Sequence, residues 1–227
     1  MHFILIGLII VGIVYIPGLW VRRVLERYST PDDRYSGTGA DLARHLLDLN
    51  ELQAVAVEET EAGDHYDPVE KVVRLSPGNF SSRSLTAITV AAHEVGHAIQ
   101  DKEAYAPLRL RSHLVRATQK VEKLGAGILI LAPFAGVLTR APGVGVIMLI
   151  GGLLTLASAT LVHFVTLPTE IDASFGRAMP MLKEHQILQP PDAPHARKIL
   201  QAAAYTYVAA SLMSLLNVAR WWAILRR

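Results

Sequence analysis

The stretch from residue 89 to residue 100 reads Thr89-Val90-Ala91-Ala92-His93-Glu94-Val95-Gly96-His97-Ala98-Ile99-Gln100. Apolar residues recur in and around it at spacings of three and four, which predicts a helix from about residue 84 to residue 102. On a helix, His93 and His97 project side by side, and two neighbouring neutral imidazoles are suitable zinc ligands. Glu94 follows the first histidine and could take a proton from a zinc-bound water. This His-Glu-x-x-His pattern predicts the metal centre of a zinc peptidase.

Small residues surround the two histidines on this predicted helix: Ala91, Ala92, Gly96 and Ala98. Small side chains allow another segment of backbone to approach a helix closely. We therefore expect such a segment to pack against the helix at the histidines. A helix that merely carried two histidines on a polar face would not need this pattern.

The composition limits the possible partners and metal ligands. The chain has 227 residues, 51% of them apolar, and a formal net charge of +2. So small a charge, with no basic run interleaved with aromatic residues, argues against a nucleic-acid partner. The chain has no cysteine, which excludes a disulfide framework, a thiolate zinc site and a cysteine nucleophile. A bound metal must therefore be held by histidine and carboxylate side chains.

Three long apolar segments predict an integral membrane protein, so the lipid bilayer is an expected partner. Residues 1–21 have no cleavage site of the signal-peptide kind and end at Trp20 and two arginines, which predicts a retained transmembrane anchor. Residues 124–165 are expected to form a transmembrane hairpin, and residues 202–227 an apolar helix that also lies in the membrane. Most lysines and arginines lie between the first two segments, which by the positive-inside rule places the zinc-binding part in the cytoplasm.

The zinc-binding part is expected in two polar regions, residues 22–123 and residues 166–201. Within the first region, short apolar runs predict strands at about 54–57 and 71–76, joined by a polar loop into a hairpin. His65 and Tyr66 of this loop could face the metal or could be ordinary turn residues. The predicted fold is mainly α-helical with a small β-hairpin or sheet, and combines integral membrane helices with a zincin-like metalloprotease domain.

A catalytic zinc site usually has three protein ligands and one open position. The candidates for the third ligand are six side chains: His65, Glu103, His113, His163, Glu170 and Asp172. Glu170 follows Pro168, at which a helix is predicted to begin, and some zinc peptidases take their third ligand from a glutamate on a later helix. Spacing alone favours Glu170 and leaves the others open.

Six segments carry a family resemblance: residues 37–40 (Gly-Thr-Gly-Ala), 64–68 (Asp-His-Tyr-Asp-Pro), 75–77 (Leu-Ser-Pro), 90–100, 105–108 (Tyr-Ala-Pro-Leu) and 167–174 (Leu-Pro-Thr-Glu-Ile-Asp-Ala-Ser). In this order they resemble the YugP-type family of bacterial membrane zinc metallopeptidases. The layout is more distantly similar to the HtpX-like membrane proteases. The match covers most of the chain, and it implies a location in the inner (plasma) membrane of a bacterium.

The resemblance implies three zinc ligands, His93, His97 and Glu170. It also implies that Glu94 is the catalytic acid/base. Ser174 stands where the HtpX-like pattern has an aspartate, so the identity of the residue that orients the ligands is open between Asp172, Asp67 and none.

The expected activity is that of an endopeptidase which hydrolyses peptide bonds at the cytoplasmic membrane surface, with Glu94 activating a zinc-bound water. Candidates for contacts to the oxyanion or the substrate are His65, Tyr66 and Arg177. Peptides and segments of membrane proteins are the expected substrates. One alternative is a non-proteolytic, chaperone-like zinc scaffold in the membrane, with His65 as a fourth ligand. Another is a hydrolase that acts on lipid. The sequence does not determine the oligomeric state.

Overall fold

The helix that carries both histidines forms where the sequence predicts it, as α4 (Leu85–Lys102). Ser84 caps this helix, because its side chain accepts a hydrogen bond from the backbone N–H of Ala87 at 3.2 Å. The cap satisfies one of the amide groups that a helix start leaves without a partner. Residues 85–100 are all buried. Since many of these side chains are small, other elements can pack around the whole circumference of α4.

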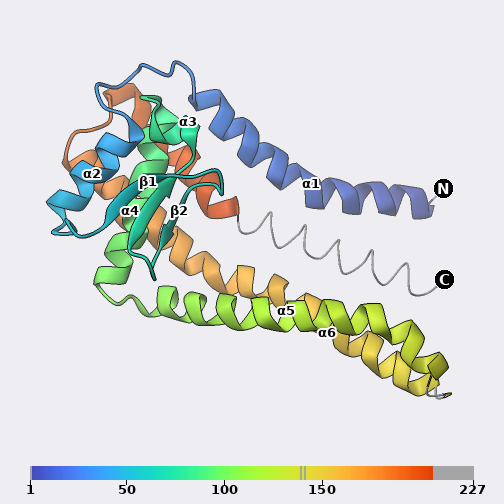
Figure 1. Cartoon of the computed structure of the whole chain (residues 1–227). Coiled ribbons are helices and arrows are strands. Elements are labelled where there is room, and N and C mark those ends of the chain that lie inside the picture. Colours follow the sequence, from blue (N-terminus) through green and yellow to red (C-terminus); the bar gives the residue numbers. More distant parts are fainter. Residues whose placement is uncertain (1, 139, 141, 207–227) are drawn as a thin grey trace. The chain divides into compact units, whose positions relative to one another are not determined.

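The computed structural model describes residues 2–138, 140 and 142–206. The described chain falls into two compact units. The first unit comprises residues 2–18 and 110–166, and the second comprises residues 19–109 and 167–206. The second unit contains α4 and the small sheet that lies beside it (Figure 1).

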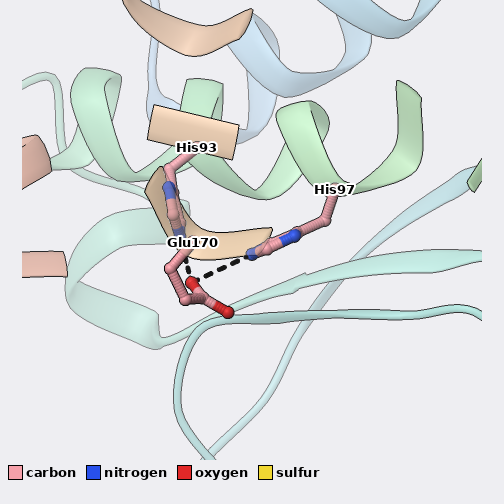
Figure 2. A group of neighbouring side chains, drawn as sticks. All are labelled: His93, His97 and Glu170. Carbon is pink, nitrogen blue, oxygen red and sulfur yellow. Dashed lines mark ion pairs between the residues drawn. The ribbon is translucent and has the colours of Figure 1, made fainter. Parts of the chain in front are cut away.

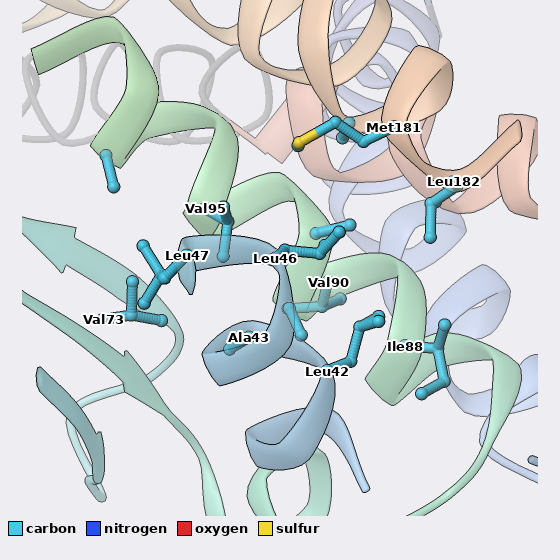
Figure 3. Close-up of a cluster of buried hydrophobic side chains, with 14 of the residues drawn as sticks. Leu42, Ala43, Leu46, Leu47, Val73, Ile88, Val90, Val95, Met181 and Leu182 are labelled. Carbon is cyan, nitrogen blue, oxygen red and sulfur yellow. The ribbon is translucent and has the colours of Figure 1, made fainter. Parts of the chain in front are cut away.

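The hydrophobic core of the second unit forms between α4 and α2 (Gly39–Leu49). A capping box starts α2, in which Thr38 and Asp41 each accept a hydrogen bond from the other's backbone N–H. The apolar stripe of α2 is at most 8% exposed: Leu42, Ala43, Leu46 and Leu47. Figure 3 shows this stripe beside Val90 and Val95 of α4. Burial of each leucine contributes about 1.5–3 kcal/mol, so this contact is a main source of stability.

Three short strands form the sheet, in the order β1–β3–β2. β1 (Ala56–Glu59) runs parallel to β3 (Val72–Leu75), and β2 (His65–Asp67) runs antiparallel to β3. The predicted hairpin between the first and last of these strands is therefore wrong. The connection between them is not a simple loop: it turns at Gly63, whose φ is +90°, and returns as β2. Because of this extra strand, β3 runs in the same direction as β1.

Three long helices make up most of the first unit: α1 (His2–Tyr28), α5 (Ala106–Leu138) and α6 (Pro142–Ile171). The prediction of integral membrane helices is wrong for the part of the chain that the structure describes, where no helix combines the length and apolar character needed to cross a membrane. The apolar runs at 1–21 and 124–165 are parts of longer helices that continue into charged or polar turns. Hydropathy of a run taken alone does not reveal this continuation.

One further expectation depended on these spans, and another concerned the C-terminal segment. The predicted cytoplasmic location of the zinc site was inferred from the lysines and arginines that flank the predicted spans at 1–21 and 124–165. The predicted C-terminal membrane helix, residues 202–227, lies outside the described residues from 207 onward. Residues 193–206 are helical and belong to the second unit.

Glu170 lies near the end of α6 and not at the start of a helix. α6 passes through Pro168 and continues as the π-helix η1 (Asp172–Ala178) and then as α7 (Met179–Glu184). The prediction that a helix begins after Pro168 is therefore wrong, because a proline removes one backbone hydrogen bond without preventing helical geometry on either side. Two short helical turns complete the fold, α3 (Pro77–Phe80) and η2 (Pro190–Asp192).

Candidate metal centre

Two histidines of α4 and one glutamate of α6 converge in the second unit. Nε2 of His93 lies 3.2 Å from Oε2 of Glu170, and Nε2 of His97 lies 3.3 Å from the same oxygen. Figure 2 shows the three side chains pointing toward one another. All three are buried, and Glu170 is only 1% exposed. Buried ionisable groups gathered in this way are typical of a metal or catalytic site.

The distances within this group suit a tetrahedral zinc ion. Ligand atoms about 2.0–2.1 Å from a tetrahedral zinc lie about 3.3–3.4 Å from each other. The two nitrogen–oxygen distances, 3.2 Å and 3.3 Å, agree with this spacing. Two imidazole nitrogens and a carboxylate oxygen are also ligands that zinc accepts, and they leave a fourth position open. His93, His97 and Glu170 could therefore hold a zinc ion.

A serine hydroxyl fixes which nitrogen of the first histidine carries the proton. Nδ1 of His93 lies 3.1 Å from Oγ of Ser174, and that hydroxyl donates to the carbonyl oxygen of Leu200 at 3.3 Å. Because the hydroxyl has one hydrogen and directs it at Leu200, it accepts a hydrogen bond from Nδ1–H of His93. The lone pair of Nε2 is then left on the side of Glu170.

A glutamine contacts the second histidine at the corresponding ring nitrogen. Oε1 of Gln100 lies 3.0 Å from Nδ1 of His97. The amide nitrogen of Gln100 donates to the carbonyl oxygen of Thr169 at 2.9 Å and to Oδ2 of Asp172 at 2.8 Å. Both amide hydrogens are thus in use, so the amide oxygen accepts from Nδ1–H of His97. Two unprotonated Nε2 atoms that face one carboxylate repel it unless a cation lies between them, and this arrangement favours a metal ion.

Close packing of η1 on α4 brings the glutamate-bearing segment to the histidines. A Cβ placed at Gly96 would lie 2.7 Å from the carbonyl oxygen of Ala173, which is too close for any residue but glycine. The expectation that another segment approaches the small residues of this helix is therefore confirmed.

Two of the residues expected to contact the oxyanion or substrate are directed elsewhere. The hydroxyl of Tyr66 donates to Oδ2 of Asp101 at 2.6 Å. Burial, together with this hydrogen bond, raises the pKa of the Tyr66 phenol, so the phenol stays neutral. Nδ1 of His65 lies 2.8 Å from the carbonyl oxygen of Gly63, within its own turn. Both residues lie on β2, and these contacts hold that strand in place.

The third such residue, Arg177, belongs to a charged chain beside the histidines. It donates to Asp172 at 2.8 Å and pairs with Glu103 at 2.9 Å. Asp172 in turn accepts from Gln100, so it reaches a candidate ligand through the glutamine and not directly. Asp67, the other aspartate considered for this role, accepts hydrogen bonds from the backbone of its own turn.

Sequence reasoning did not identify Gln100 and Ser174 as the partners of the two histidines. The pattern that could have revealed them is helical spacing, since Gln100 is three residues after His97 and Ser174 is four after Glu170. Residues at these spacings share a helix face. Glu94 itself is buried on α4, at 6% exposure.

The remaining candidates for the third ligand are paired with other residues, exposed, or not among the side chains that the structure describes. Glu103 pairs with Arg177, and His113 is exposed on α5. The side chain of His163 is not among those that the structure describes. Among the described side chains, the group that could hold a metal ion is His93, His97 and Glu170.

Comparisons with known proteins identify the family of the chain. The chain is 36% identical over 224 residues to the "Putative membrane protease YugP" of Bacillus subtilis (strain 168), an alignment that covers 97% of this chain and 95% of that protein. No solved structure matches the chain. The model of the family described as "Putative neutral zinc metallopeptidase" matches residues 3–226. The predicted resemblance is confirmed, and the chain belongs to this family of neutral zinc metallopeptidases.

Proposed function

We propose that the protein is a zinc-dependent endopeptidase in which His93, His97 and Glu170 hold the metal and Glu94 is the general acid/base. The observation that carries this proposal is the convergence of two histidine Nε2 atoms on one buried carboxylate oxygen, at 3.2 Å and 3.3 Å. Membership of a zinc metallopeptidase family supports the same metal and the same class of reaction.

A zinc ion at this centre would supply a Lewis acid that polarises a peptide carbonyl and lowers the pKa of water. Glu94 takes a proton from the attacking water as the water oxygen bonds to the carbonyl carbon. It returns the proton to the leaving nitrogen as the carbon–nitrogen bond breaks, so the products are a carboxylate and an amine. Meanwhile the hydrogen bond to Ser174 keeps His93 in the Nδ1–H tautomer.

We propose that the substrate is an extended peptide that pairs with the sheet. β2 is an edge strand of the order β1–β3–β2 and packs against α4. An extended chain can add to such an edge through main-chain hydrogen bonds. In this proposal Tyr66 and Arg177 keep the surrounding elements in place and do not contact the reacting atoms.

The name of the Bacillus relative, a putative membrane protease, supports substrates located at membranes. We therefore propose membrane proteins and their unfolded segments as the substrates to test first. The cytoplasmic location of the site stays a prediction.

The test compares wild type with Glu94→Gln and Glu170→Ala, measuring bound zinc by elemental analysis and cleavage of an unfolded protein such as casein. We expect Glu94→Gln to keep its zinc and to lose activity by about 10²–10⁴-fold. Glu170→Ala should lose both zinc and activity. The control is Glu184→Gln, which alters an exposed glutamate of α7 and should change neither.

Two outcomes would overturn parts of the proposal. If Glu170→Ala retained a full complement of zinc, the third ligand would lie elsewhere. If wild type bound zinc but cleaved neither casein nor membrane-protein segments, and Glu94→Gln behaved like wild type in cells, the non-proteolytic zinc scaffold would replace the peptidase.

A further inference from the structure

A buried glutamine joins the two segments that carry the candidate zinc ligands. Gln100 lies on α4 and is 0% exposed. Its amide oxygen contacts Nδ1 of His97 at 3.0 Å, on its own helix. Its amide nitrogen donates to the carbonyl oxygen of Thr169, the residue before Glu170, at 2.9 Å. One planar amide thus contacts a histidine ligand directly and the backbone beside the carboxylate ligand.

A chain of charges sets the orientation of this amide. Oδ2 of Asp172 accepts from the Gln100 amide nitrogen at 2.8 Å and from Nε of Arg177 at 2.8 Å. Arg177 is held in turn by Glu103 at 2.9 Å. If the amide were flipped, its oxygen would face both the carbonyl of Thr169 and the carboxylate of Asp172. Three acceptors would then meet without a hydrogen between them, which is costly at a buried site.

We propose that Gln100 is a positioning residue that specifies the Nδ1–H tautomer of His97 and sets the distance between His97 and Glu170. This inference rests on the metal centre proposed above. A histidine that binds a metal through Nε2 must carry its proton on Nδ1, and a hydrogen bond at Nδ1 fixes both the tautomer and the ring plane. The contact with Thr169 links the same amide to the segment that bears Glu170, so a single side chain relates two of the three ligands.

Gln100→Met tests this role because methionine has a similar length but lacks the amide. We expect the zinc affinity, measured by competition with a chromophoric chelator, to fall about 10–100-fold. In the zinc-free protein, ¹⁵N NMR of the histidine rings should show wild-type His97 protonated at Nδ1 and the variant with a mixture of tautomers. The control is Thr86→Val, which removes another side-chain hydrogen bond from α4, the part-buried one to the carbonyl oxygen of Leu25 at 2.9 Å. It should leave both the zinc affinity and the His97 tautomer unchanged.

Asp172→Ala is the second variant, and it decides the question if Gln100→Met does not fold. This change leaves the amide in place and removes the acceptor that orients it, and Asp172 is partly exposed, so the fold should tolerate the change. We expect a fall in zinc affinity of about tenfold or less, together with a partial loss of the Nδ1–H tautomer. Wild-type zinc affinity and an unchanged His97 tautomer in the folded variants would overturn the inference.

These readouts separate the inference from the proposed function. If wild type binds one zinc and Gln100→Met binds it weakly, the positioning role stands even when no peptide is cleaved. If the variant binds zinc like wild type while Glu94→Gln abolishes cleavage, the peptidase stands and the positioning role fails. A wild-type protein that binds no zinc would overturn both.

Discussion

Replacement of Gly96 by alanine should disturb the metal centre through packing alone. The new Cβ would lie 2.7 Å from the carbonyl oxygen of Ala173, whereas ordinary contacts begin at 3.4 Å. The Cβ would thus be about 0.7 Å too close to backbone atoms of Ala173. Because the contact involves backbone and the interior is close-packed, moving a flexible side chain cannot relieve it. We therefore expect η1 to move away from α4, and with it Ser174, which contacts Nδ1 of His93.

Two opposing terms determine the effect on stability. Alanine in place of glycine inside a helix contributes about 0.5–1 kcal/mol of stability. Overpacking of a close contact costs about 1–3 kcal/mol. The expected net loss in the free energy of unfolding of the zinc-free protein is about 1 kcal/mol, within a range of about 0–2.5 kcal/mol. Because a metal site tolerates displacements of only about 0.5 Å, the zinc affinity should also fall about 10–100-fold.

Urea unfolding of the zinc-free protein gives the first quantity, and chelator competition gives the second. Gly78→Ala is the matched control, since a Cβ at Gly78 would meet no atom within 4 Å. This control should leave the zinc affinity at its wild-type value and the stability at, or up to about 1 kcal/mol above, that of wild type. If Gly96→Ala matched wild type in both measurements, close packing of η1 on α4 would not set the geometry of the centre. Lower stability with unchanged zinc affinity would mean that this packing serves folding only.

Three further predictions concern the surroundings of the site. Tyr66→Phe removes a hydrogen bond to Asp101 and should lower the free energy of unfolding by about 1–2 kcal/mol, yet leave the activity of the zinc-loaded enzyme unchanged; a large loss of activity would restore Tyr66 as an oxyanion contact. Burial alone would raise the pKa of Asp192, but hydrogen bonds from Arg34 and Tyr35 outweigh it and lower the pKa. The free energy of unfolding should therefore decrease as the pH falls below about 4, the pKa of an aspartate in the unfolded chain. Asp192→Asn should make the free energy of unfolding, measured by urea unfolding at several pH values, depend less steeply on pH. If the variant showed an equally steep pH dependence, other carboxylates would be responsible for it. Free zinc at 100 times its dissociation constant should add about 2.7 kcal/mol to the free energy of unfolding, seen as a higher melting temperature in thermal melts. A chelator should abolish this gain, and Glu170→Ala should not show it.

Several features of the fold and site could be predicted from local pattern. The spacing of three and four around His93 and His97 predicted α4. The small residues near Gly96 predicted the close approach of another segment. Each of these predictions depends on residues within a few turns of one another, where helical geometry leaves little freedom.

Other features could not be read locally. The apolar runs at 1–21 and 124–165 suggested membrane spans, but the first is part of α1 and the second is divided between α5 and α6, and these helices continue into turns of different character. The connection between β1 and β3 resembled a loop because a strand of three residues, β2, is too short to show alternation. Pro168 resembled a helix start because the continuation of α6 into η1 depends on packing against α4 and not on the proline itself.

By itself, the sequence determined the chemistry available: two histidines one helical turn apart, a glutamate between them, and no thiol to compete for a metal. It also favoured Glu170 among the third-ligand candidates and supported the family resemblance. Only the tertiary structure decided that Gln100 and Ser174 contact the Nδ1 atoms of His97 and His93, and that Tyr66 and Arg177 are engaged elsewhere. The physical reason is that a ligand type depends on one residue, whereas a hydrogen-bond partner depends on the distance and direction between segments far apart in the chain.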